Sequence, residues 1–114
     1  MGPDEAPEAE GAPGASDPLA ATPAGRPLTG HARESLRRHG FQEPFAQVDD
    51  IIDHPTRTTT QADGATVSIQ RVGPRGRKYN IVIEGEEGIV TGMRDLSRHE
   101  LDNLGKRYGF TPHP

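Results

Sequence analysis

Aromatic and β-branched aliphatic side chains are absent from the first part of this chain. Residues 1–28 contain no aromatic residue, Ile or Val, and consist mostly of Ala, Pro, Gly and acidic residues. Such a segment buries too little apolar surface to offset the entropy lost when its backbone becomes ordered. We therefore predict a disordered linker over residues 1–28 and one small domain over residues 29–114, near the size limit for a single core.

The acidic excess of the chain lies in that predicted linker. The full chain carries 17 acidic and 13 basic residues, and removing the five acids and one arginine of residues 1–28 leaves 12 of each. A neutral domain does not bind nucleic acids through a general positive field, although a local basic site remains compatible with it. The chain has no cysteine, which excludes disulfides and thiol chemistry. It also has no apolar run long enough to span a bilayer.

Two helices are predicted at the start of the domain. The first has Thr29 as its N-cap and Gly40 as the residue that closes it, because apolar residues recur between them at helical spacing. The second is predicted to begin at Pro44, a residue suited to the first helical turn, and to stop before Pro55.

A sheet and a last helix are predicted to follow. Alternating apolar residues indicate strands over residues 65–71, 78–84 and 88–93, the second of them covered on both faces. Residues 57–64 are predicted to be an extended connection. Ser97 and Glu100 form a capping box that opens the last helix. The predicted fold class is α+β, with two N-terminal helices packed on a three- or four-stranded antiparallel sheet and followed by a C-terminal helix.

His31, at the start of the first predicted helix, is the first candidate for a catalytic side chain. Imidazole accepts and donates protons near neutral pH, and RNA transesterification needs both at the 2′-hydroxyl and at the leaving 5′-oxygen. The alternative interpretation is a solvated side chain in a first helical turn, without a chemical role.

A basic segment joins the first two predicted strands. Four cations and two glycines occur in eight residues, a composition that suits phosphate binding: Arg71, Arg75, Arg77 and Lys78. Arg71 and Lys78 lie at strand ends and are therefore better fixed, which favours them for catalytic roles. Arg75 and Arg77 are candidates for substrate binding. The same composition is also typical of a solvated hairpin loop.

Further candidates lie on or near the predicted strands. Thr91 interrupts an apolar strand and precedes a glycine, which allows another group to approach closely. Threonine is also simply a good strand former. The Tyr79 hydroxyl is a candidate phosphate contact, although an aromatic residue at this position is more typical of the core. Arg94 follows the last strand and has either a substrate or an acidic neighbour as its candidate partner.

Metal and cofactor chemistry find little support in the sequence. The histidines are scattered without the spacing of a zinc site: His31, His39, His54, His99 and His113. The acidic residues of the second helix, Asp49, Asp50 and Asp53, are predicted on its exposed face. No phosphate-binding or dinucleotide-binding glycine motif occurs, so no cofactor is expected.

This set of residues resembles small bacterial ribonuclease toxin domains of the barnase, EndoU, colicin and RelE type, many of which are C-terminal domains of polymorphic toxins. The resemblance covers residues 29–93 and rests on His31-Ala32, Leu36, Gly40-Phe41, a Val/Ile-rich second helix, Gly76-Arg77-Lys78-Tyr79 and Gly88-Ile89-Val90-Thr91. It implies N-terminal helices packed on a four-stranded antiparallel sheet. The chain departs from the pattern at Ser35, where an arginine is expected, and Arg38 is a candidate replacement.

The resemblance also implies roles for individual residues. His31 would be the general acid or base, and Lys78 or Arg71 would bind the phosphate in the transition state. Thr91 would donate a hydrogen bond to the phosphate or substrate. The implied activity is metal-independent cleavage of RNA, with tRNA as one target, through a 2′,3′-cyclic phosphate.

The same resemblance implies partners and a place of action. A cognate immunity protein would neutralise the domain, and a delivery module would precede it in a larger secreted bacterial protein that acts in the cytoplasm of a target cell. Two other function classes remain open. One is a non-catalytic interaction module, such as an immunity protein, an antitoxin or an effector-binding domain. The other is an ADP-ribosyltransferase toxin.

Overall fold

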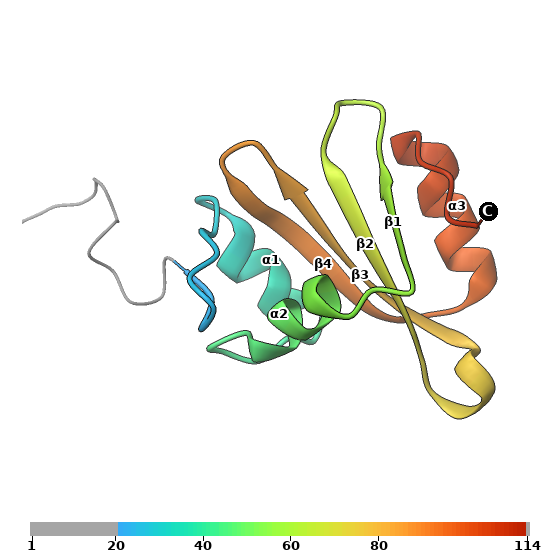
Figure 1. Ribbon diagram of the computed structural model, residues 1–114, viewed down its shortest axis with the longest axis horizontal. Coiled ribbons are helices and arrows are strands. Elements are labelled where there is room, and N and C mark those ends of the chain that lie inside the picture. Colours follow the sequence, from blue (N-terminus) through green and yellow to red (C-terminus); the bar gives the residue numbers. More distant parts are fainter. Residues whose placement is uncertain (1–20, 114) are drawn as a thin grey trace, which may run out of the picture.

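Four antiparallel strands form the middle layer of the protein, of which the computed structural model describes residues 21–113 (Figure 1). They are β1 (Arg57–Thr60), β2 (Thr66–Val72), β3 (Lys78–Gly85) and β4 (Gly88–Leu96). Each strand pairs with the next in the chain, so the order in the sheet is β1-β2-β3-β4. Residues 57–60 form a strand where a connection was predicted, because this threonine-rich stretch pairs with β2 from Arg57 opposite Ile69 to Thr60 opposite Thr66.

Helices cover both faces of the sheet. The helices α1 (Ala32–Arg38) and α2 (Ala46–Asp53) lie on one face, and α3 (Arg98–Tyr108) lies on the other (Figure 1). The side chains of β3 alternate between the two resulting cores. Ile81 and Ile83 pack with Leu101 of α3, whereas Val82 packs with residues of α1 and α2. The α+β fold predicted from the sequence is therefore confirmed, as is the burial of β3 on both sides.

The first two helices begin later than predicted. His31 occupies the N-cap position of α1, two residues beyond Thr29, and Gly40 follows the helix with φ of 92°, as predicted. The helix α2 begins at Ala46 rather than at Pro44. Phe45 precedes it in a left-handed conformation with φ of 74°, and its ring is buried in the core.

The segment before α1 packs against α2, so the folded unit begins earlier than residue 29. Thr22 is buried, and its hydroxyl donates a hydrogen bond to Asp49 over 2.6 Å. The Arg26 guanidinium pairs with Asp49 at 2.9 Å and with Asp53 at 2.7 Å. The prediction that residues 21–28 belong to a disordered linker is therefore wrong. Residues 1–20, the rest of the predicted linker, lie outside the described residues.

Asp49 is the centre of this packing, and its predicted exposure is wrong. Only 8% of the residue is accessible to solvent. Burial by itself would raise the pKa of the Asp49 carboxyl, but hydrogen bonds from Thr22, from the backbone N–H of Ala24 and from Arg26 outweigh it and hold the pKa below its ordinary value.

The helix α3 begins and ends as predicted. Ser97 and Glu100 exchange the two hydrogen bonds of a capping box, and Gly109 ends the helix with φ of 77°. In the described part of the chain, no helix combines the length and the apolar character needed to cross a membrane.

Candidate phosphate-binding site

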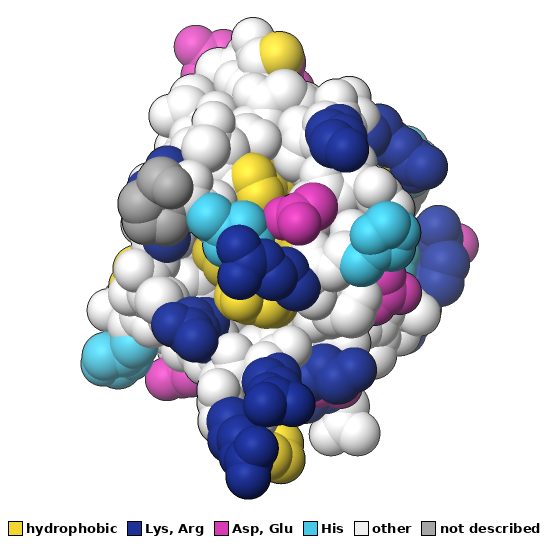
Figure 2. Space-filling model, turned by 90° about the vertical axis from the view of Figure 1, so that its right-hand side faces the viewer, with side chains coloured by type: hydrophobic (Ala, Val, Ile, Leu, Met, Phe, Trp, Pro, Cys, Tyr) yellow, Lys and Arg dark blue, Asp and Glu magenta, His cyan; other side chains and the backbone are white. Residues whose placement is uncertain are grey.

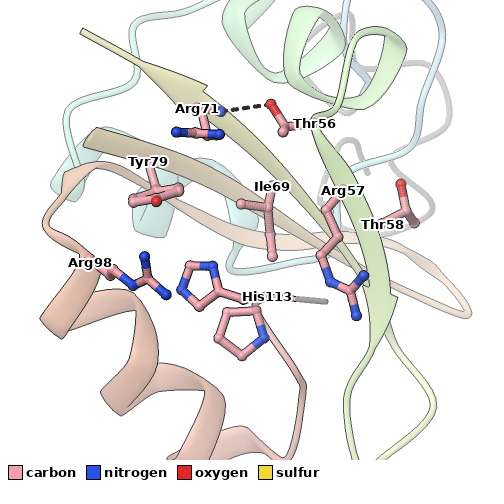
Figure 3. A pocket seen from close by; sticks show the side chains of 9 residues that line it. Thr56, Arg57, Thr58, Ile69, Arg71, Tyr79, Arg98 and His113 are labelled. Carbon is pink, nitrogen blue, oxygen red and sulfur yellow. Dashed lines mark hydrogen bonds between the residues drawn. The ribbon is translucent and has the colours of Figure 1, made fainter. Parts of the chain in front are cut away.

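A cavity of about 580 Å³ opens on the α3 face of the sheet (Figure 3). Its walls come from β1, β2, β3, the start of α3 and the segment after α3. They contain three arginines, one histidine and one tyrosine, and neither Asp nor Glu. The lining residues are Thr56, Arg57, Thr58, Ile69, Arg71, Tyr79, Arg98, Pro112 and His113.

The pairing of the strands places four of these side chains together. Arg57 lies opposite Ile69, and Arg71 lies opposite Tyr79. Residues that are paired, or two apart on one strand, project from the same face of a sheet. Arg57, Ile69, Arg71 and Tyr79 therefore share the face that α3 covers elsewhere, at the end of the sheet where the cavity lies.

The segment after α3 brings His113 over this face. Phe110 is buried in the core beneath α3. The Arg57 Nε donates a hydrogen bond to the Thr111 carbonyl oxygen over 3.0 Å. Gly105 allows the close return of the chain, because a Cβ at this position would lie 2.7 Å from the Phe110 carbonyl oxygen. The cavity thus depends on a turn of the backbone that only a small residue permits.

His113 is held by two contacts. Its Nε2 lies 2.9 Å from Oδ1 of Asp102, which is on α3 outside the cavity lining. Its ring meets the Tyr79 ring edge to face, with centroids 5.9 Å apart. A carboxylate accepts, so Nε2 carries the proton, and Nδ1 of the neutral ring is left as an acceptor. A carboxylate that orients an imidazole in this way is a recurring feature of general-base catalysis.

The three arginines of the cavity have no acidic partner in the part of the chain that the structure describes. Within residues 21–113, no carboxylate forms an ion pair with Arg57, Arg71 or Arg98. Arg71 is instead fixed by its Nε, which donates to the Gly76 carbonyl oxygen over 3.2 Å. In Figure 3, Arg57 and Arg98 lie on opposite sides of His113. Guanidinium groups gathered in a cavity repel one another, and an anion bound between them relieves this repulsion.

The structure brings together only some of the residues singled out in the sequence. Arg71 and Tyr79 both line the cavity. Lys78 is the first residue of β3 and projects from the face opposite to that of Tyr79. Thr91 pairs with Ile83, which lies five residues after Lys78 on β3. At roughly 3.4 Å per residue, Lys78 and Thr91 are therefore about 17 Å apart along the strand. His31 is exposed on α1, which covers the opposite face of the sheet. His31, Lys78 and Thr91 therefore do not form one site with Arg71.

Thr91 and His31 belong instead to a seam between α1 and β4. The Thr91 hydroxyl lies 2.5 Å from the hydroxyl of Ser35. Ser35 follows His31 by one helical turn and so occupies the same strip of the helix. Arg94, farther along β4, donates to the Gly40 carbonyl oxygen over 2.8 Å rather than to an acidic neighbour. Arg38 is exposed on the last turn of α1.

Three basic residues of the cavity were not recognised in the sequence as site residues. Arg57 and Thr59 are the half-buried residues of β1, which alternate with exposed ones. This alternation indicates that Arg57 faces the interior only once residues 57–60 are assigned to a strand. Arg98 and His113 carry no local signal. Their position depends on how the chain returns to the sheet after Leu96 and after Gly109.

Comparison of the chain with models of protein families, with characterised proteins and with solved structures gives no match. Among residues 21–113, no group of three or more His, Asp or Glu side chains is placed to hold a metal ion.

Proposed function

We propose that the protein is a metal-independent endoribonuclease that binds a phosphodiester of RNA in the cavity. The observation that carries this proposal is one cavity that combines an imidazole oriented by a carboxylate with three arginines that form no ion pair within residues 21–113. Guanidinium groups pair with phosphate oxygens and stabilise the charge that develops on them during transesterification. The volume of about 580 Å³ lies in the range of small-ligand sites.

Five side chains of the cavity have a role in this reaction. Nδ1 of His113 accepts the proton of the ribose 2′-hydroxyl as O2′ bonds to phosphorus. The bond from phosphorus to the 5′-oxygen breaks, water protonates that oxygen, and a 2′,3′-cyclic phosphate remains. Arg57, Arg71 and Arg98 bind the non-bridging oxygens, and the Tyr79 hydroxyl donates a hydrogen bond to the same group.

The biological setting follows from the resemblance of the sequence to toxin domains. We propose a toxin that is neutralised by a cognate immunity protein, delivered as the C-terminal part of a larger secreted protein and active in the cytoplasm of the target cell. RNA, with tRNA as one candidate, is the substrate. Cleavage in the presence of a chelator tests the independence from metal.

The test of the proposed site is RNA cleavage by purified variants in EDTA. His113→Ala is expected to slow cleavage by about 10²–10⁴-fold, the usual contribution of a general base. His31→Ala is the matched control, because it removes an exposed imidazole on the other face, and it is expected to cleave at the wild-type rate. The opposite pattern would place the chemistry at the seam between α1 and β4, where the Ser35–Thr91 contact lies. Intact RNA with every variant, wild type included, would refute the nuclease.

A non-catalytic module is the second candidate, because the same three arginines would bind an anionic partner without breaking any bond. Binding of RNA or of an acidic protein without turnover would support this candidate. Consumption of NAD⁺ by the purified protein would instead indicate ADP-ribosyl transfer.

A further inference from the structure

We infer that the substrate is an RNA strand that extends beyond the cavity onto the β2–β3 hairpin. The hairpin then forms a subsite for the phosphates that flank the cleaved one. This inference rests on the proposed function and specifies its substrate. Residues 73–77 connect β2 to β3 and project past the end of the sheet (Figure 1). They carry Arg75 and Arg77, and Lys78 follows as the first residue of β3.

Arg71 joins the hairpin to the cavity. It lines the cavity, and its Nε donates a hydrogen bond to the Gly76 carbonyl oxygen. A Cβ on Gly76 would lie 3.4 Å from that Nε, so the hairpin backbone packs directly on the arginine. Lys78 packs across the hairpin, within 3.5 Å of where a Cβ on Gly73 would stand. The backbone that carries Arg75 and Arg77 is therefore held next to the cavity.

The β2–β3 hairpin and the two strands that it joins carry mainly positive charge next to the cavity. Residues 65–83 contain four basic residues and no acidic one. Acidic residues stand instead at the opposite ends of β2 and β3, and Asp63, Glu84 and Glu86 line a separate cavity there. Figure 2 shows Lys and Arg side chains gathered at the lower end of the face it presents, where the hairpin projects in Figure 1. A domain without net charge thus presents a basic hairpin to a polyanion.

Arg75 has an unusual backbone for an arginine. Its φ of 61° and ψ of 17° lie in the left-handed region, between Gly73 with φ of 78° and Gly76 with φ of 60°. This conformation is unfavourable for a residue with a Cβ, and glycine would avoid that cost. No ion pair within residues 21–113 involves Arg75 or Arg77. Strain of this kind at an exposed charged residue points to an external ligand.

The test uses RNA that cannot be cleaved by attack of the 2′-oxygen. Arg75→Gln with Arg77→Gln is titrated with a 2′-O-methyl RNA of about twelve nucleotides and with the corresponding dinucleotide. We expect the variant to bind the long RNA about tenfold more weakly. The slope of log K against log salt concentration should be less negative by about 1.4, because each of the two lost phosphate contacts accounts for roughly 0.7 of that slope. Binding of the dinucleotide is expected to stay within about twofold of wild type, because its phosphate lies in the cavity.

Two controls make the result decisive. Lys106→Gln with Arg107→Gln removes the same charge from the exposed side of α3 and is expected to bind both RNAs as the wild type does. If Arg75→Gln prevents folding, Arg75→Gly with Arg77→Gln removes the same charges and keeps the left-handed backbone. Wild-type affinity of the hairpin variant for the long RNA would overturn the subsite alone. Failure of the wild-type protein to bind either RNA would overturn the proposed function as well.

Discussion

Removal of the Asp49 carboxylate should release residues 22–26 from α2, whereas Pro27 and Leu28 stay attached to β4 through Ile89. Asp49 accepts hydrogen bonds from the Thr22 hydroxyl, from the Ala24 N–H and from the Arg26 guanidinium. In Asp49→Ala the buried Thr22 hydroxyl and the Ala24 N–H lose their partner, at about 1 kcal/mol or more each. The ion pair with the partly exposed Arg26 adds only about 0.5–1 kcal/mol after screening by solvent.

The expected loss of unfolding free energy is therefore about 2–4 kcal/mol, or roughly 10–20 °C in Tm for a domain of this size. Asp49→Asn is expected to lose about half as much. An amide presents one acceptor oxygen, whereas the carboxylate accepts on both of its oxygens. The measurement is urea and thermal unfolding followed by circular dichroism.

The stabilisation by Asp49 should also depend on pH. Its pKa is lowered in the folded protein, so the contribution is complete above the unfolded value of about 3.9 and is lost as the pH falls through the folded value. The difference between wild type and Asp49→Asn should therefore be constant near neutral pH and shrink below about pH 4. Asp50→Asn, at the exposed neighbouring position, is the matched control and should change stability by about 0.5 kcal/mol or less. Equal stability of Asp49→Ala and wild type would refute the packing of residues 21–28 on α2.

Two other substitutions test local features of the chain. Arg75→Gly should raise the unfolding free energy by up to about 1 kcal/mol in thermal unfolding, because glycine adopts φ of 61° without steric cost; a loss of stability would show that the Arg75 side chain contributes to the fold. Gly105→Ala should cost about 1–2 kcal/mol, because the new Cβ would clash with the Phe110 carbonyl oxygen while helix propensity recovers only part of the loss. This variant should also bind phosphate more weakly, as the segment that carries His113 is displaced, and unchanged phosphate affinity would argue against that dependence.

The sequence predicted the fold well wherever the signal was local. The alternation of Tyr79, Ile81 and Ile83 with Val82 identified a strand buried on both faces, because each face has its own core. The capping box of Ser97 was equally visible, since both of its hydrogen bonds join residues three apart. Patterns of this kind involve only residues that are close together in the sequence, so they can be recognised without knowing the tertiary contacts.

Contacts between distant segments escaped the sequence analysis. Asp49 appeared solvated because its partners Thr22 and Arg26 lie in a segment with the composition of a linker. In the same way, Arg71 was singled out from a local cluster of cations, whereas Arg57 and His113 reach the cavity only through the pairing of β1 and the return of the chain after α3. The catalytic role that the sequence predicts for His31 is untested and is the alternative to His113 that the His31→Ala variant tests.

The occupancy of the cavity by phosphate is the central claim, and an NMR titration of the labelled protein with a 3′-mononucleotide tests it most directly. The side-chain signals of Arg57, Arg71, Arg98 and His113 should shift together with a single affinity, while those of the seam residues His31 and Thr91 remain in place. Shifts confined to the seam, or no shift in the cavity at millimolar nucleotide, would contradict the proposed site.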